Sequence, residues 1–410
     1  MASSSSRAVL VLNTGSSSIK YALYKVGMRA SCLFQGKVEG IGTPKSTVSH
    51  KNLQTKEHNK LQDLHLADHK VGLKQVVELL QLGEGGSAKI TAVGHRVVHG
   101  GESLTEPALI TSEVKKEIEK ATPLAPLHNP ASLQGIEVSE ELLRCPQVAV
   151  FDTAFHATIP PHAYMYALPY HLYQQLGIRR YGFHGTSYRY LLGQASEMLK
   201  KPKEELNIIF FHLGAGASVA AVQQGKCLDT SMGVTPLEGL VMATRCGDID
   251  PAVAGILASQ KGMNADQIDN LMNKESGLYG LCGDKDMKTI IEAADAGSLK
   301  HKLALRVFVH RIRKYLGAYL VHLEGHVDAL VFSAGIGERS SEVRTLVCDG
   351  LEQFGFAVDE QKNSVGGSHG REIQKDGSKI KVLVIPTDEE LSIAQQTMEV
   401  VEGLQTAQAA

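Results

Sequence analysis

Residues 8–27 read AVLVLNTGSSSIKYALYKVG, and this stretch decides the fold. An apolar run, Val9–Leu12, enters a turn of small and polar residues, and apolar alternation resumes at Ile19. This pattern predicts two strands joined by a Gly/Ser tip. Residues 207–225, NIIFFHLGAGASVAAVQQG, repeat the pattern half a chain-length later. We interpret the pair as a duplication, in which each half opens with a hairpin; chance likeness of two glycine turns is the alternative.

Composition bounds the class of protein. A chain of 410 residues predicts between two and three domains. The net charge of −2 argues against a protein that coats nucleic acid or an anionic membrane. With 43% hydrophobic and 21% charged residues, the chain is expected to fold around a sizeable core. The charge-free stretch 206–225 has bilayer length, but its amides and glycines favour a buried hairpin.

Cysteine usage and the first residues bear on the compartment. The six cysteines are scattered, with no C-x-x-C and no Cys/His ligand spacing, which is typical of a reduced, intracellular protein. The Ser-rich start, residues 1–7, lacks the apolar segment of a secretory signal and is expected to fray. We therefore expect a cytoplasmic protein, or one in the soluble interior of an organelle, that is not secreted.

Periodicity predicts alternating helices and strands. Helical spacing occurs over 71–82, 132–143 and 305–323, and apolar strand-like runs occur at 147–151, 329–332 and 382–385. A last helix is expected to begin at Thr387, with Glu390 completing a capping box. Two polar stretches, 43–70 and 361–379, are interpreted as surface excursions. The order of elements indicates an α/β class with mixed sheets.

The glycine-rich turns suit anion binding. A tip made of Gly and Ser leaves backbone N–H groups bare, and no Cβ blocks a phosphate. A third glycine turn, SAGIGE, covers 333–338. The sequence has no Walker A motif or protein-kinase loop, and Gly214-x-Gly216 lacks the third glycine of the dinucleotide fingerprint. The turns therefore predict phosphate binding outside those common motifs.

Four polar clusters accompany the turns: GHRVVHGG at 94–101, FDTAFH at 151–156, YGFHGTS at 181–187 and TRCGDIDP at 244–251. Any one of them alone favours a structural histidine or a salt-bridged arginine. Together with three phosphate-sized turns, they favour a functional site over structural roles alone.

At this point the sequence resembles the acetokinase family of acetate kinases, in the sugar kinase/actin/heat-shock-chaperone ATPase superfamily. The resemblance rests on segments in the family's order from residue 10 to 394: LVLNTGSSSIKY, GHRVVHGGE, PLAPLHNPASL, FDTAFHATIP, RRYGFHGTS, HLGAGAS, DTSMGVTPLEGLVMATRCGDIDP, FSAGIGERSSEVR and VIPTDEELSIA. It implies an α/β fold of two domains with a duplicated ribonuclease-H-like core and an interdomain cleft. The first domain would comprise 7–151 plus 390–410, the returning C-terminal helix, and the second 152–389 with the nucleotide site.

The resemblance also implies an activity. Members transfer the γ-phosphoryl group of ATP to acetate, reversibly and in line, giving acetyl phosphate and ADP. Mg²⁺ would assist, with Mn²⁺ as a substitute. The partners would be acetate or acetyl phosphate, ATP or ADP and a second copy in a homodimer, with no nucleic acid and no membrane.

By position, the resemblance assigns roles to individual residues. Arg96 and Arg245 would hold the acetate carboxylate and the moving phosphoryl group, since a guanidinium fork matches both. His184 would donate to the phosphoryl oxygens with His128 in support, and Asp152 would place the metal or orient these groups. The remaining expected residues are Asn13 and Glu389 for the metal; Val98, Leu127, Phe183 and Pro236 for the acetate methyl; and Ser16, Ser18, Lys20, His212, Gly214, Ala215, Gly216, Asp286, Met287, Lys288, Gly335, Ile336 and Gly337 for the nucleotide.

Five positions depart from the usual family pattern. Ala215 stands where Asn is usual, which removes a polar phosphate contact. Asp388 stands where Asn is common and would add a carboxylate beside the metal ligand. The other departures are Tyr188 for His, Lys288 for Arg and Arg339 for Asn.

Three alternatives to an acetate kinase stay open. The first is a kinase for propionate or another short carboxylate, since one methylene changes binding by only about 1–3 kcal/mol. The second is a nucleotide-gripping protein without a small substrate, against which the Arg96, Arg245 and His184 set speaks. The third is a degenerate pseudokinase, motivated by Ala215.

Overall fold

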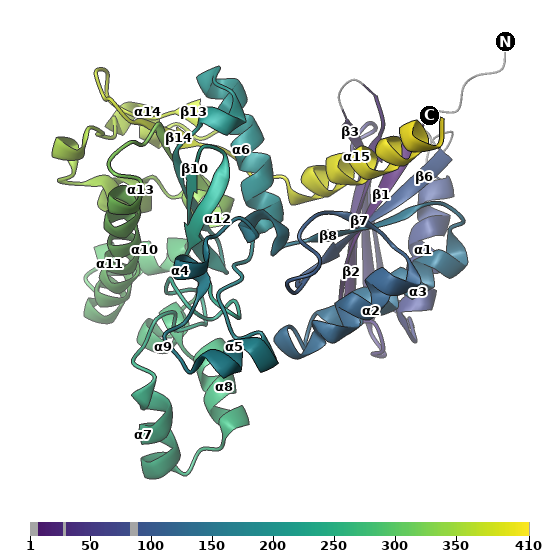
Figure 1. Cartoon of the computed structure of the whole chain (residues 1–410), viewed down its shortest axis with the longest axis horizontal. Coiled ribbons are helices and arrows are strands. Elements are labelled where there is room, and N and C mark those ends of the chain that lie inside the picture. Colours follow the sequence, from purple (N-terminus) through teal and green to yellow (C-terminus); the bar gives the residue numbers. More distant parts are fainter. Residues whose placement is uncertain (1–6, 28–29, 83–88, 410) are drawn as a thin grey trace. The chain divides into compact units, whose positions relative to one another are not determined.

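The computed structural model describes residues 7–27, 30–82 and 89–409 (Figure 1). The start of the chain that was expected to fray lies mostly outside these residues. The chain divides into two compact units: Met1–Phe155 with Asp388–Ala410 form unit 1, and His156–Thr387 form unit 2. Within the described ranges, no helix combines the length and apolarity needed to cross a bilayer.

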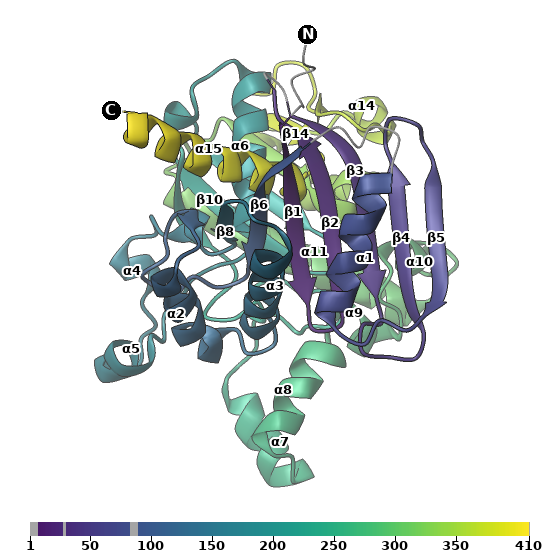
Figure 2. The ribbon, with the colours of Figure 1, turned by 90° about the vertical axis from the view of Figure 1, so that its right-hand side faces the viewer.

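Unit 1 is built on a mixed sheet with strand order β5-β4-β3-β2-β1-β6-β8-β7. Strands β1, β2 and β3 run antiparallel, whereas β6 is parallel to β1 and β8 is parallel to β6. Figure 2 shows β4 and β5 at the edge beside β3. The strands are β1 (Arg7–Gly15), β2 (Ser18–Lys25), β3 (Ser31–Glu39), β4 (Ser46–Asn52), β5 (His58–Leu64), β6 (Lys89–Val97), β7 (Ala108–Leu109) and β8 (Gln147–Phe151).

Helices cover both faces of this sheet because its central strands are apolar on both sides. Alternate residues of β1 point to opposite faces: Leu10 packs in the core with α1 (His69–Leu82) and α3 (Asn129–Leu142). Val9 and Val11 pack on the other face with Ile393 of α15 (Glu389–Ala409). The helix α2 (Ser112–Lys120) packs on α3. The last residues of the chain therefore complete the core of the first unit.

Unit 2 repeats the arrangement with order β11-β10-β9-β12-β14-β13. In Figure 1, α6 (Gly185–Leu199) and α11 (Leu299–His322) lie on opposite sides of this sheet. The strands are β9 (Ile208–Leu213), β10 (Ala217–Gln223), β11 (Lys226–Thr230), β12 (Ala329–Ser333), β13 (Arg371–Glu372) and β14 (Lys381–Val384). The other helices are α4 (Pro161–Tyr164), α5 (Tyr170–Leu176), α7 (Ala252–Lys261), α8 (Ala265–Lys274), α9 (Gly277–Cys282), α10 (Met287–Asp295), α12 (Ala334–Arg339), α13 (Ser341–Cys348) and α14 (Glu360–Ser364).

The two sheets share one plan, which confirms the duplicated core. The series β3-β2-β1-β6-β8 in unit 1 corresponds to β11-β10-β9-β12-β14 in unit 2. In each series the first three strands are antiparallel and the last two are parallel to the third. Each hairpin read from the sequence forms the second and third strands of its series. The predicted α/β class is therefore confirmed.

Three local expectations were wrong. Asp388, not Thr387, caps α15, because its carboxylate accepts from the Leu391 N–H at 2.8 Å. The polar stretch 43–70 contributes β4 and β5 to the sheet, since its buried residues alternate along β4. The turn expected at 333–338 is instead the last residue of β12 followed by α12 itself, with Ala334 at φ 62°.

Candidate functional site

At one edge of the unit 1 sheet, the carboxyl ends of three parallel strands bring predicted residues together. Arg96 is the penultimate residue of β6, and Asp152 follows β8, donating its N–H to Val97 O at 3.0 Å. Asn13 lies near the end of β1, opposite Lys20 of β2. The first turn of α15, which packs on these strands, supplies Glu389. Side chains from distant parts of the sequence therefore gather at the edge where ligands bind in parallel sheets.

Arg96 and Asp152 form a two-point ion pair. Arg96 Nε donates to Asp152 Oδ1 at 3.2 Å and Nη2 donates to Oδ2 at 2.5 Å. The Asp152 side chain is 1% exposed and that of Arg96 22% exposed. Burial opposes the charge on Arg96, but Asp152 and Glu389 outweigh it, so the pKa of Arg96 is raised. The pair leaves part of the guanidinium open to an anion.

Glu389 sits in a crowded electrostatic setting. Burial raises the pKa of Glu389 to about 7, Asp152 and Glu390 add to the rise, and Arg96 opposes it. A carboxylate held this way gains from a nearby divalent cation, because the cation favours its charged form. Among the described residues, no group of three or more His, Cys, Asp or Glu is arranged to hold a metal. Mg²⁺ accepts such a sparse set, since it usually keeps several waters and binds one or two carboxylates plus phosphate oxygens.

The tip between β1 and β2 presents small polar residues. Ser16 and Lys20 are exposed, Ser18 and Asn13 are half-buried, and the Lys20 charge acts to lower the pKa of Glu389. Of the two unit 1 residues expected beside the acetate methyl, Val98 and Leu127, Val98 is buried, with 8% of its surface exposed. Leu127 is 71% exposed, and His128 is exposed at the N-terminal end of α3. Within unit 1, Leu127 and His128 are therefore surface residues.

In unit 2, His184 occupies a strained backbone position. It has φ 60°, the left-handed region that costs a non-glycine residue about 1–2 kcal/mol, and it precedes α6. The preceding segment is fixed: His156 Nε2 lies 2.9 Å from Phe183 O, and a Cβ on Gly182 would lie 2.7 Å from the His156 ring. Phe183 itself is 2% exposed. Strain held by its surroundings in this way is concentrated at functional sites.

His184 and His212 form a stacked pair. Their ring centroids are 4.1 Å apart and the ring planes differ by 19°. His184 Nδ1 lies 2.9 Å from Ser218 Oγ, and His212 Nδ1 lies 2.9 Å from Ser187 Oγ. Each serine in turn bonds a second hydroxyl: Tyr188 OH for Ser218 and Thr387 Oγ1 for Ser187. Both rings are thus held through Nδ1.

Arg245 approaches the glycine turn between β9 and β10. A Cβ built on Gly216 would lie 3.5 Å from His184 Nε2 and 3.7 Å from Arg245 Nη1. Arg245 Nη1 also donates to the backbone oxygen of Pro236 at 3.3 Å. Burial lowers the pKa of Arg245, and no carboxylate within the described part of the chain pairs with it. A half-buried cation without a counter-ion is suited to an anionic ligand.

The loop that carries Arg245 is held by two other arginines. Arg180 donates to three successive carbonyl oxygens of residues 230–232 and to Glu238. Arg311 donates to Gly239 O and Asp248 O. The loop bends back on itself at Gly239 and Gly247, which have φ 103° and 67°. A segment of irregular backbone is thereby fixed in one shape.

Beside the same turn, unit 2 has a cavity of about 650 Å³. That volume suits a ligand of nucleotide size. It brings together seven of the residues expected to bind nucleotide: Gly214, Ala215, Asp286, Met287, Lys288, Gly335 and Ile336. The other lining residues are Lys285, Ile291, Glu292, Arg339, Ser340, Ser341 and Glu342. Gly216, Gly337 and His212 lie outside the cavity lining.

The five residues that differ from the usual family pattern lie in different environments. Ala215 is exposed at the turn, while Lys288 and Arg339 line the cavity. Tyr188 is fully buried behind the stacked histidines. Asp388 places its carboxylate next to Glu389 in sequence, where it caps α15 and accepts from Tyr24 OH at 3.1 Å.

Sequence reasoning missed the hydroxyl groups behind the histidines. Ser218 lies opposite His212 in the β9–β10 register, so the hairpin pattern contained a signal for it. Ser187 and Tyr188 lie in the first turn of α6, after Gly185 and Thr186, where position alone did not show which way their side chains point. Thr387 was expected as a helix cap and instead bonds Ser187.

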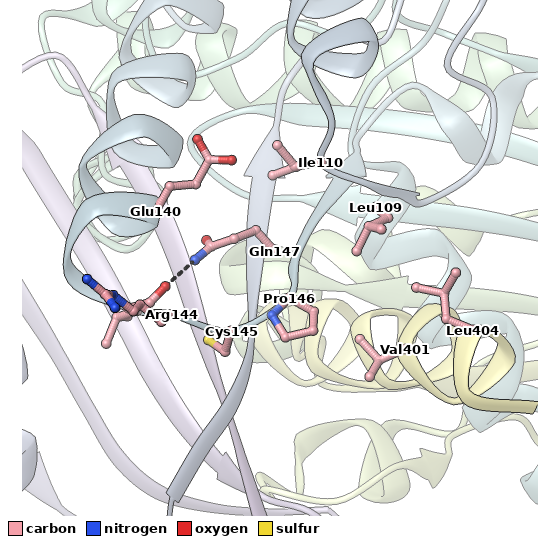
Figure 3. Close-up of a pocket in the computed structure, with 10 residues that line it drawn as sticks. Leu109, Ile110, Glu140, Arg144, Cys145, Pro146, Gln147, Val401 and Leu404 are labelled. Carbon is pink, nitrogen blue, oxygen red and sulfur yellow. Dashed lines mark hydrogen bonds between the residues drawn. The ribbon is translucent and has the colours of Figure 1, made fainter. Parts of the chain in front are cut away.

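A second cavity of about 490 Å³ lies in unit 1 beside Pro146 and Gln147 (Figure 3). These residues are at the amino-terminal end of β8, whereas Asp152 follows its carboxyl-terminal end. Val401 and Leu404 of α15 form part of its wall, and Gln147 Nε2 donates to Leu143 O at 3.3 Å. It contains no residue expected to bind substrate. It is therefore separate from the Arg96 group.

Comparison with known proteins identifies the family. The acetokinase family model matches residues 8–395. An acetate kinase of Nitratidesulfovibrio vulgaris (strain Hildenborough) is 50% identical over 402 residues, covering 96% of this chain and all of that one. The Porphyromonas gingivalis acetate kinase structure has a TM-score of 0.91 at 42% identity, covering 96% of this chain and 100% of that chain. A propionate kinase structure from Francisella tularensis has a TM-score of 0.88 at 40% identity, covering 96% and 99%. The chain belongs to the acetokinase family.

Proposed function

We propose that this protein is an acetate kinase, which moves the γ-phosphoryl group of ATP to acetate, reversibly, giving acetyl phosphate and ADP. The observation that carries the proposal is the approach of His184 Nε2 and Arg245 Nη1 to the glycine turn at Gly216, beside a nucleotide-sized cavity. Two donors and bare backbone at one point suit the spread negative charge of a phosphoryl group in flight.

The roles divide between the residues as follows. Arg245 and His184 neutralise the moving phosphoryl group, and Arg96, oriented by Asp152, binds the acetate carboxylate. The cavity around Ala215 and Lys288 takes the nucleotide. His128 supports the phosphoryl group, while the tip residues Ser16, Ser18 and Lys20 contribute to phosphate binding. We assign the acetate methyl to contacts with Val98, Leu127, Phe183 and Pro236.

Mg²⁺ is part of the proposal. Glu389 would hold it directly or through water, and Asn13 would add an amide oxygen. The metal would supply positive charge that offsets the negative charge of the phosphate groups. The raised pKa of Glu389 supports this role, since a nearby cation would restore its charge.

A homodimer in a reducing compartment completes the proposal. Helix α7 has no buried residue within unit 2, and its Ile256 is 52% exposed, which leaves an apolar helix for a second copy. All six cysteines carry free thiols. Sedimentation equilibrium tests the dimer: the wild type should run as a dimer, and a species that stays monomeric at micromolar concentration would contradict it.

Hydroxylamine trapping tests the activity. ATP, acetate and Mg²⁺ should yield trapped acetyl phosphate, and a blank result at saturating acetate would exclude the enzyme. A panel of formate, acetate, propionate and butyrate then ranks kcat/KM. Likeness to a propionate kinase makes propionate the second candidate substrate. We expect acetate to lead, with a preference over propionate of about 10-fold or more, the size of a one-methylene effect.

A further inference from the structure

We propose that Tyr188 and Ser218 are positioning residues that fix the proton of His184 on Nε2. This inference rests on the proposed function, because it explains how His184 presents a donor to the phosphoryl group. Its structural basis is a chain of three groups, Tyr188 OH, Ser218 Oγ and His184 Nδ1, with separations of 2.5 and 2.9 Å.

The order of donors follows from the chemistry of the three groups. A buried phenol has one proton to donate, and Ser218 Oγ lies within hydrogen-bond distance of the Tyr188 hydroxyl. With that oxygen accepting from Tyr188, the serine proton is directed to His184 Nδ1. A nitrogen that accepts a hydrogen bond carries no proton of its own, so the neutral ring holds its proton on Nε2.

The surroundings keep the phenol in its donor form. Tyr188 is 0% exposed and contacts the rings of His156, Phe210 and His212. Burial raises the pKa of Tyr188, so its hydroxyl stays protonated across the range in which enzymes work. Ser218 is also fully buried, which excludes water as a competing partner.

The direction in which His184 Nε2 points explains why its proton must be fixed. That nitrogen lies on the side of Gly216, where a built Cβ would be 3.5 Å away. With the proton on Nδ1 instead, Nε2 would turn a lone pair toward an incoming phosphate oxygen, and the two would repel. The hydrogen-bond relay from Tyr188 through Ser218 to His184 therefore excludes the unproductive tautomer before substrate binds.

Tyr188 makes this device a property of this chain, since the resemblance places His at the corresponding position in many family members. An imidazole N–H there can also donate to Ser218. Tyr188→His should therefore preserve the relay, whereas Tyr188→Phe should remove its first donor and allow Ser218 to point either way.

Nitrogen-15 NMR of the free, full-length protein labelled at histidine tests the inference without any turnover. His184 of the wild type should give the pattern of a neutral ring with its proton on Nε2. Tyr188→Phe should show a mixture of the two tautomers, and Tyr188→His should restore the wild-type pattern. Ser218→Ala should also give a mixture, while Ser218→Thr keeps the hydroxyl and the single tautomer.

Kinetics give the second readout. Tyr188→Phe should lower kcat about 10-fold, the effect of losing one hydrogen bond, with KM for both substrates nearly unchanged. Tyr21→Phe is the matched control, because Tyr21 is a buried tyrosine in unit 1 whose hydroxyl lies 2.7 Å from His50 Nδ1. It should lose similar stability without altering the His184 spectrum.

The outcomes separate the two proposals. A wild-type His184 with its proton on Nδ1, or a spectrum identical in Tyr188→Phe, would overturn the relay even in an active enzyme. Should Tyr188→Phe fail to fold, the Ser218→Thr and Ser218→Ala pair decides by the same spectrum. A wild type that forms no acetyl phosphate but shows the expected tautomers would contradict the function and leave the relay standing.

Discussion

His184 and His212 stack face to face, with 4.1 Å between ring centroids. Two imidazoles this close repel if both carry a charge, so the arrangement favours at most one cation in the pair. The hydroxyl groups on both Nδ1 atoms fix the rings from behind. Unit 2 therefore holds both imidazole rings in fixed orientations.

Arg96→Ala should lower kcat/KM by about 10²–10³-fold, the typical effect of deleting one well-placed donor. It should also destabilise the fold by about 3–5 kcal/mol, because Asp152 is left as an unpaired buried charge. Steady-state kinetics and urea unfolding measure the two effects. The Arg96→Ala/Asp152→Ala double variant should recover stability but not activity. Arg144→Ala, an exposed arginine at the other sheet edge, is the control, and an Arg96 variant as active as this control would refute the assignment.

Ala215→Asn should lower KM for ATP about 3–10-fold, because the amide adds one hydrogen bond at the exposed turn of the nucleotide cavity. Initial rates at varied ATP and saturating acetate measure it, and kcat should change little. An unchanged KM would show that position 215 does not contact the nucleotide.

Glu389→Gln should raise the Mg²⁺ concentration needed for half-maximal rate by about 10-fold or more, since an amide is a weaker ligand than a carboxylate. Titration of Mg²⁺ at fixed ATP measures the shift. Asp388→Asn is the matched control: Asn caps a helix as well as Asp, so both stability and Mg²⁺ response should persist. Equal responses in the two variants would remove Glu389 from the metal site.

Acid should weaken the fold through His95. Burial lowers the pKa of His95 to about 4, against an ordinary value of 6.5, although its bond to Gln147 opposes the shift. The unfolded chain therefore binds the proton first. This contribution to the free energy of unfolding is complete above pH 6.5 and is lost as pH falls toward 4, by up to about 3 kcal/mol. Urea unfolding at pH 7.5, 6 and 5 should show a shallower decline for His95→Gln, and parallel declines would exclude His95 as the cause.

Gly277→Ala should destabilise the fold by about 2 kcal/mol or more and reduce kcat/KM. Gly277 has φ 63°, and a Cβ there would lie 2.2 Å from Met242 O and 2.7 Å from Arg245 O, so the arginine segment must shift. Thermal unfolding and kinetics measure both effects. Gly317→Ala in α11 meets open space and should add about 0.5–1 kcal/mol of stability instead. The same sign of change in both variants would contradict this reading.

The sequence predicted the structural features that depend on a local pattern of apolar and polar residues. Alternation around two glycine turns predicted both hairpins, and apolar strand runs placed Asp152 at a strand end. It failed where a choice between neighbouring residues depends on three-dimensional direction. Thr387 and Asp388 are both good capping residues, and only the path of the chain decides that Asp388 caps while Thr387 bonds Ser187.

Some residues of the candidate site were likewise predictable from the sequence, and others were not. Motif residues such as Arg96 and His184 were found because their neighbours form recognisable segments. The Tyr188–Ser218 link was not found, because the two residues lie 30 positions apart and meet through the packing of α6 on β9 and β10. Hydrogen-bond partners across elements leave no periodic trace in a sequence.

Helix α15 covers one face of the unit 1 sheet, so the order in which the chain is synthesised affects when each unit can fold. Residues 156–387 emerge from the ribosome as one continuous segment and can fold at once, whereas unit 1 must wait for Ile393, Ala394 and Val401 to cover Val9 and Val11. A chain released before residue 388 would leave that apolar face in water and lack Glu389. Truncated products are thus expected to aggregate, and they would lack the carboxylate that we propose as a metal ligand.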